Sequence, residues 1–235
     1  MQLDQVVPFG RSLDEYIHMF ALSETDLQKS ILSVADGPAS FNAEGTDKGY
    51  KIQSCDPLYV FEAGEIRDRF YAVRDNIISQ IENTRDSWVW SYHQSPTALK
   101  AHRTEVAERF CADFHQGKQT RRYIADSLPK LTSATSSYDL CLCSHFLFLY
   151  AEQFDTAFHI NAIAQMLRIS PEVRIFPLLT LAQAQSPHVA PVIKHFSQLG
   201  HQCSLEKVDY ELQPGGDKMM RITRADECAD ACNDK

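Results

Sequence analysis

The 235-residue sequence is short of glycine, has few basic clusters, and contains no long apolar run. Only nine glycines are present, and neither G-x-G-x-x-G nor G-x-x-x-x-G-K-[ST] occurs, which argues against a dinucleotide fingerprint and a P-loop. The net charge is −8 with no basic cluster beyond Arg121-Arg122, so no nucleic-acid partner is expected.

Membrane-spanning and secretory patterns are also missing. The longest apolar run, Leu140–Tyr150, is shorter than the ~18 residues of a membrane span and is interrupted by Ser144 and His145. The stretch Met1–Arg11 lacks the basic-then-apolar pattern of a signal peptide. Seven cysteines, an odd number in such a chain, indicate reduced thiols. We therefore expect a soluble, cytoplasmic protein with no membrane partner.

The most informative pattern that is present lies between residues 31 and 59. Ile31–Ala35 is a short apolar run that stops at the turn 36–39, and the second run, Ile52–Cys55, is followed by Asp56. Small side chains in such a turn let the backbone approach a ligand, and a strand-end acid accepts hydrogen bonds from ribose hydroxyls. The pattern predicts a nucleoside-containing cofactor, with a turn that binds nothing as the alternative.

The remaining sequence alternates between helical and strand patterns. Helices are expected over 11–30, 62–83, 96–116, 154–168 and 187–199, strands near 122–125, 138–143 and 173–179, and a closing hairpin from 204–212 and 218–223.

This alternation predicts an α/β fold: a Rossmann-like, doubly wound, mostly parallel seven-stranded sheet with a C-terminal antiparallel hairpin. A helical insertion of about 61–121 follows the second strand, and an acidic tail covers 224–235, all within a single domain, 1–235. Within the insertion, Trp88–His93 holds both tryptophans. We interpret this aromatic segment as a core staple, with an aromatic wall over a substrate as the alternative.

These residues resemble the class I S-adenosylmethionine-dependent methyltransferase family from about Tyr16 to Ile222. The turn 35–39 stands where that family has its glycine-rich loop, and Asp56 where it has the ribose-binding acid. The GPASF turn and the LCSHFLFLY segment resemble a little-characterised bacterial subgroup. The resemblance implies S-adenosylmethionine as cofactor, bound by Ala35, Asp36, Gly37, Pro38, Ala39, Asp56, Pro57, Asp126, Ser127, Leu128, Cys143 and Ser144.

Two departures from the family pattern are visible. Gly37 alone remains of the three loop glycines, with Ala35 and Ala39 keeping the side chains small. Ser33 stands where the first strand of the family carries an acid. Asp36, three residues further on, is the candidate to replace that charge.

His145, at the carboxyl end of a predicted strand, is the candidate general base. Its alternative role is that of a histidine satisfied by backbone hydrogen bonds. Tyr16 and Tyr150 are further candidates for closing the site.

Two groups of cysteines are candidate metal ligands. Cys141, Cys143 and His145 share one face of a strand, but no second ligand pair with zinc-site spacing accompanies them. Cys228 and Cys232 lie four residues apart in the acidic tail. No metal site is expected from either group.

The resemblance implies methyl transfer to an unidentified, small-molecule acceptor, with the oligomeric state left open. A non-catalytic cofactor-binding relative and a protein methyltransferase that docks its substrate on 61–121 are alternatives. An NAD-dependent oxidoreductase shares the turn and the strand-end acid but not the glycine spacing or the closing hairpin. A hydrolase is disfavoured because no G-x-S-x-G elbow occurs.

Overall fold

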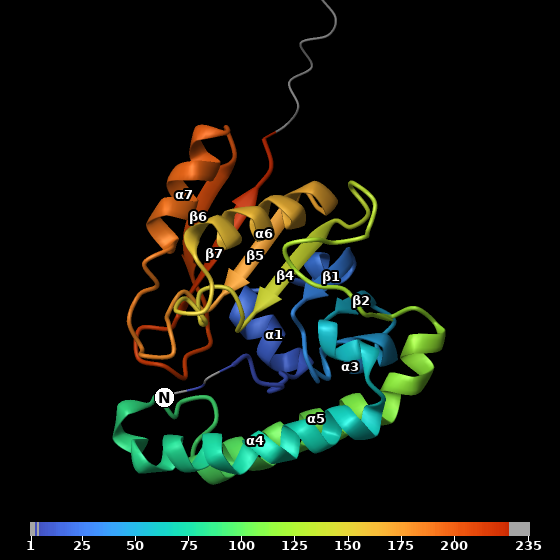
Figure 1. The fold of residues 1–235 in the computed structure, drawn as a ribbon, viewed down its shortest axis with the longest axis vertical. Helices are drawn as coiled ribbons and strands as arrows, with labels where there is room; N and C mark the ends of the chain where they lie inside the picture. Colours follow the sequence, from blue (N-terminus) through green and yellow to red (C-terminus); the bar gives the residue numbers. More distant parts are fainter. Residues whose placement is uncertain (1–2, 4, 226–235) are drawn as a thin grey trace, which may run out of the picture.

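A twisted seven-stranded sheet forms the centre of the computed structural model, which describes residue 3 and residues 5–225 (Figure 1). The first five strands in the chain are parallel, and β7 runs antiparallel to both β5 and β6. This confirms the predicted doubly wound sheet with its C-terminal antiparallel pair. Across the sheet the order is β3 (Tyr123–Ile124), β2 (Lys51–Cys55), β1 (Ser30–Val34), β4 (Leu140–Ser144), β5 (Glu172–Phe176), β7 (Lys218–Thr223) and β6 (Gln202–Lys207).

The register of the central strands brings their carboxyl ends to one level. Val34 is paired with Cys55 of β2 on one side and with Cys143 of β4 on the other. Strand β4 is buried along its whole length, as expected for the centre of a parallel sheet. The segments that follow β1, β2 and β4 therefore emerge side by side at one edge.

Helices cover both faces of the sheet. Helices α1 (Leu13–Phe20) and α3 (Phe41–Asp47) pack on one face, and α6 (Thr156–Ile169) and α7 (Val189–Gln198) on the other.

The single helix expected over 11–30 is two helices. Ser12 and Glu15 form the capping box that begins α1, as the sequence spacing predicts. At Ala21 the backbone takes a left-handed conformation with φ of 46°, which ends α1. Ser23 then caps the short helix α2 (Glu24–Leu27).

The insertion is a pair of long helices, α4 (Ala63–Asn83) and α5 (Pro96–Gln119), which run side by side along the bottom of Figure 1. The connection contains a short 3-10 turn, η2 (Arg85–Ser87), followed by Trp88. Trp88 is buried against both helices, and its indole N–H donates to Thr84 Oγ1 over 3.0 Å. Among the residues that the structure describes, every helix is too short or too polar to span a bilayer.

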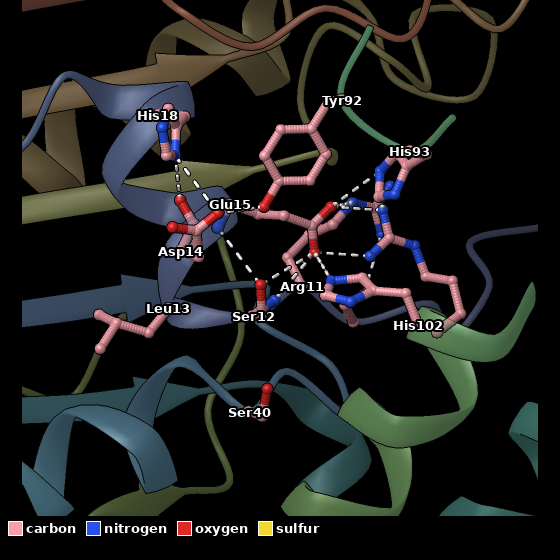
Figure 2. A network of polar contacts seen from close by, with 12 residues as sticks. Arg11, Ser12, Leu13, Asp14, Glu15, His18, Ser40, Tyr92, His93 and His102 are labelled. Carbon is pink, nitrogen blue, oxygen red and sulfur yellow. Dashed lines mark hydrogen bonds and ion pairs between the residues drawn. The ribbon is translucent and has the colours of Figure 1, made fainter. Parts of the chain in front are cut away.

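A buried ionic network joins the insertion to helix α1, which packs on the sheet. Glu15 of α1 is fully buried and accepts hydrogen bonds of 2.6 and 2.5 Å from Nη1 and Nη2 of Arg103, on α5. His93 and His102 also point toward this carboxylate (Figure 2). Burial raises the pKa of Glu15, but Arg103 and the two histidines outweigh it and hold the pKa well below its usual range. Glu15 is therefore ionised.

The strand expected over 204–212 ends earlier, at Lys207. Beyond it Val208 and Tyr210 turn inward and are buried, and Tyr210 donates its hydroxyl hydrogen to Glu15 Oε1 over 3.0 Å. The physical reason is that the tyrosine satisfies the buried carboxylate instead of continuing the edge strand.

We expect Arg103→Met to lower the free energy of unfolding by about 3–5 kcal/mol, because it leaves the Glu15 carboxylate buried without its cation. The matched control is Arg109→Met on the same helix, whose partner Asp47 is largely exposed. That change is expected to cost no more than about 1 kcal/mol. Urea unfolding followed by tryptophan fluorescence measures both, and equal losses in the two variants would contradict the structural role of Glu15–Arg103.

Candidate functional site

A cavity of about 350 Å³ opens at the carboxyl ends of β1, β2 and β4. This is the point where the strand order reverses, because β2 lies on one side of β1 and β4 on the other. Open α/β sheets bind ligands at such switch points. Residues named from the sequence that line this cavity are Ala35, Asp36, Gly37, Asp56, Pro57, Ser127, Leu128, Ser144 and His145.

Four other residues named from the sequence lie outside the cavity wall. Ala39 and Cys143 are buried in the core, and the carbonyl of Pro38 faces Gly10. Asp126 instead closes its own loop, because its Oδ2 accepts hydrogen bonds of 2.7 and 2.8 Å from the backbone N–H and the hydroxyl of Thr132.

The turn after β1 is held by its neighbours. Ala35 has a φ of 54° and donates its N–H to the carbonyl of Cys55 over 2.8 Å. Gly37 has a φ of 55°, a backbone conformation that favours glycine. Its N–H donates to Asp56 Oδ2 over 2.9 Å, and its carbonyl accepts the hydroxyl of Tyr59 over 2.7 Å. The turn thus has two left-handed positions, of which one is occupied by glycine and the other by alanine.

The segment before α1 packs directly on the turn. A Cβ at Gly10 would lie 2.1 Å from the carbonyl oxygen of Pro38, so only glycine fits this approach. The N–H of Ser40, at the start of α3, donates to the carbonyl of Arg11 over 3.1 Å. The amino end of α3 is thus covered by the chain itself.

Asp36 stands at the cavity with one oxygen uncommitted. Its Oδ1 accepts hydrogen bonds from the hydroxyls of Tyr16 and Ser33, the latter over 2.7 Å. Its Oδ2 is buried and has no hydrogen-bond partner among the described residues. Burial raises the pKa of Asp36, and the nearby hydroxyl of Ser54, followed by those of Tyr16 and Ser33, opposes this rise. Ser33, which stands where an acid is expected on the strand, thus donates a hydrogen bond to the carboxylate of Asp36 on the turn.

Asp56 links the turn to the end of β2. Its Oδ2 accepts from Gly37, and its Oδ1 accepts the N–H of Leu58 over 2.8 Å as the cap of the 3-10 helix η1 (Pro57–Val60). Burial raises the pKa of Asp56 to about 6, despite these two hydrogen bonds. Each carboxylate oxygen can accept a further hydrogen bond from a ligand.

His145 follows β4 with a φ of 50° and lines the cavity. Its backbone N–H donates to the carbonyl of Phe176 over 2.6 Å, and its Nδ1 is 2.9 Å from Ser144 Oγ. Burial, and then the charges of Arg11 and Arg103, lower the pKa of His145 well below its usual value. The imidazole is therefore uncharged and a weak proton acceptor.

The two tyrosines named from the sequence have different positions. Tyr16 lines the cavity beside Asp36. Tyr150 does not line it, and its hydroxyl oxygen accepts the N–H of Val7 over 3.2 Å.

Sequence reasoning missed two parts of the cavity wall. One is aromatic: Phe154 and Phe158 stack with ring centroids 4.3 Å apart. The other is the N-terminal segment, including Phe9 and Arg11. The apolar residues before the Ser12 cap signal a contact with the core, but nothing in their spacing indicates where that contact lies.

No group of three or more His, Cys, Asp or Glu side chains is placed to hold a metal ion within the residues that the structure describes. Cys228 and Cys232 lie outside the described residues.

No protein-family model matches the chain. The uncharacterized protein MJ0045 of Methanocaldococcus jannaschii is 32% identical over 225 residues, which are 95% of this chain and 99% of that protein. This relative is archaeal, so the bacterial subgroup expected from the GPASF and LCSHFLFLY segments stays a prediction.

Solved structures show a weaker likeness. Magnesium protoporphyrin IX methyltransferase (ChlM) from Synechocystis PCC 6803, with bound SAM, is 13% identical at a TM-score of 0.46, covering 91% of this chain and 78% of that one. The PH0226 protein from Pyrococcus horikoshii OT3 is 9% identical at a TM-score of 0.48, covering 90% and 89%. At these values neither structure transfers an activity to this chain.

We expect Gly10→Ala to lower the free energy of unfolding by about 1–3 kcal/mol, because the added methyl group forces the segment away from the turn. Gly64→Ala is the matched control, since a Cβ there meets no atom within 4 Å. In helix α4 that control is expected to be neutral or to stabilise by up to about 1 kcal/mol. Urea midpoints measure both, and equal stability of the two variants would show that the close approach is unimportant.

Proposed function

We propose that this chain, which belongs to the same family as the uncharacterized protein MJ0045 of Methanocaldococcus jannaschii, is an S-adenosylmethionine-dependent methyltransferase. The observation that carries the proposal is the pair of buried carboxylates, Asp36 and Asp56, at one cavity of the sheet edge. S-adenosylmethionine carries a sulfonium and an ammonium group. Its positive charge would therefore compensate the two buried carboxylates at the turn.

The proposed binding mode assigns a part of the cofactor to each wall. Asp56 accepts hydrogen bonds from the ribose hydroxyls, beside the close backbone at Gly37. Leu58 and Leu128, which line the cavity, flank the adenine. The unpartnered Oδ2 of Asp36 accepts from the ammonium of the methionine part. Ser127 and Ser144, which line the cavity, are further proposed contacts, and Asp126 is proposed to act by holding the loop that carries Ser127.

The chemistry proposed is an in-line displacement. A lone pair of the acceptor forms a bond to the methyl carbon while the electrons of the carbon–sulfur bond return to sulfur. S-adenosylhomocysteine is then released. The protein contributes positioning and the exclusion of water. His145 fits the role of an uncharged hydrogen-bonding group better than that of a general base, because its pKa is lowered.

The NAD-dependent alternative is disfavoured by two features of the cavity. A pyrophosphate needs free N–H groups at the turn and at the amino end of the following helix. Here the N–H of Gly37 is donated to Asp56, and the N–H of Ser40 is donated to Arg11. The two carboxylates would also repel a pyrophosphate.

Calorimetry tests the cofactor. We expect the protein to bind S-adenosylmethionine and S-adenosylhomocysteine but not NAD. Asp36→Asn and Asp56→Asn should each weaken binding at least about tenfold, because each removes a charge-assisted hydrogen bond. Asp139→Asn is the control, since Asp139 is exposed at the opposite edge of the sheet, where it binds Ser30. Unchanged affinity in both cavity variants would refute this binding mode, and binding without turnover on any amine, thiol or hydroxyl acceptor would favour the non-catalytic alternative.

The affinity for S-adenosylhomocysteine is expected to fall as the pH is lowered through about 6, where Asp56 takes up a proton. The raised pKa of Asp36 acts in the same direction.

The stability of the free protein depends on pH in the opposite sense. A carboxyl group with a raised pKa contributes stability that is present below the unfolded pKa of about 3.8 and is lost as the pH rises through about 6. Calorimetry from pH 5 to 8 should show that the affinity for S-adenosylhomocysteine depends less on pH in Asp56→Asn than in the wild-type protein. An identical pH dependence in the two proteins would contradict the assignment of Asp56 to the cofactor.

A further inference from the structure

A second cavity, of about 60 Å³, adjoins the first one. The two share Phe9, Arg11 and His145 in their walls. Beyond this junction the second cavity extends toward the insertion, with Ile81 of α4 and Leu99 of α5 among its lining residues. The helical insertion therefore forms one wall of this second cavity, a chamber that adjoins the proposed cofactor site.

The deep part of this chamber offers a ligand almost no hydrogen bonds. The hydroxyl hydrogen of Tyr210 is donated to Glu15, and the side-chain amide of Gln213 donates to the carbonyl of Thr180 over 2.9 Å. The indole N–H of Trp88 is donated to Thr84. A ligand that enters the chamber must therefore be apolar where it meets the insertion.

Arg11, at the junction, is a buried cation with unused donors. It is 8% exposed, and among the described residues only its Nη1 donates, to the carbonyls of Phe9 and Gly10. Its Nε has no hydrogen-bond partner among the described residues. The neighbouring carboxylate, Glu15, lies 3.9 Å from that Nε and is engaged by both Nη atoms of Arg103. Burial, and then Arg103, lower the pKa of Arg11 only to about 10, so the guanidinium keeps its charge at neutral pH.

We propose that the methyl acceptor is a small carboxylic acid with a short apolar body. Its carboxylate pairs with Arg11 at the junction, and its apolar body occupies the second cavity. One carboxylate oxygen forms the bond to the methyl carbon while the electrons of the carbon–sulfur bond return to sulfur, which gives a methyl ester and S-adenosylhomocysteine. A guanidinium suits this role because its planar donors match a carboxylate. The chamber is less than half the size of the roughly 150 Å³ cavity that accepts benzene, so it fits a short alkyl chain better than a ring. This inference rests on the proposed function and adds the class of acceptor to it.

The test uses the full-length protein saturated with S-adenosylhomocysteine. Ligand-observed NMR titrations compare butanoate with 1-butanol and butylamine, which share its length but not its negative charge. We expect butanoate to bind at least about tenfold more tightly than either, and Arg11→Met to remove that preference. Ile81→Phe, which fills the second cavity, should weaken butanoate binding by a similar factor and leave the affinity for S-adenosylhomocysteine within twofold. Leu199→Phe, at an exposed position of the molecule, is the control and should change neither affinity.

Three results would overturn the inference: equal binding of butanoate and butanol, butanoate binding that survives Ile81→Phe, or an Arg11→Met variant that loses S-adenosylhomocysteine affinity and keeps butanoate. The last result would assign Arg11 to the carboxylate of the cofactor. Failure of the wild-type protein to bind S-adenosylhomocysteine would instead overturn the proposed function. The butanoate titration of the free protein then still reports on Arg11, so the two failures are distinguishable.

Discussion

The arrangement of this molecule depends on the buried ion pair between Glu15 and Arg103, which joins helix α1, packed on the sheet, to the helical insertion. Such a pair adds little net stability, because desolvating two charges offsets most of their attraction. Its value here is geometric, since the loss of either partner leaves an uncompensated buried charge. The pair fixes α5 against α1, and with it the wall of the second cavity. Because both oxygens of Glu15 accept hydrogen bonds from Arg103, the guanidinium of the neighbouring Arg11 is left to pair with a ligand.

Charge is divided between the two ends of the joined cavities. At the turn, Asp36 and Asp56 are both buried, and burial, followed by the smaller effect of the Asp36 charge, raises the pKa of Asp56. At the junction, Arg11 is the buried cation. A ligand set with a cation at the turn and an anion at the junction neutralises both ends. S-adenosylmethionine with a carboxylic acid acceptor has that distribution, so the two proposals support each other electrostatically.

Local patterns predicted the framework because local physics determines it. The apolar run Ile31–Val34 had to be a buried strand, Ser12 with Glu15 had to begin a helix, and Asp56 had to lie at a strand end. What the sequence could not predict depends on contacts between distant segments. The approach of Gly10 to Pro38 needs two chain segments to meet, and nothing in either segment indicates the other. The strand expected over 204–212 also stops early because of a contact between distant segments, since Tyr210 donates its hydroxyl hydrogen to Glu15.

Helix α1 couples the two ends of the site through consecutive residues. Glu15 reaches Arg103 of the insertion, and Tyr16 hydrogen-bonds Asp36 at the turn while its ring stacks on Phe41 at 4.0 Å. Helix α1 therefore links the insertion, through Glu15, to the carboxylate proposed to hold the cofactor, through Tyr16. The carboxylate that Tyr16 contacts comes from the turn, at Asp36, and the strand contributes the hydroxyl of Ser33. An acid on the strand would be fixed by the sheet alone, whereas Asp36 is held in part by the helix that also holds the proposed acceptor chamber in place.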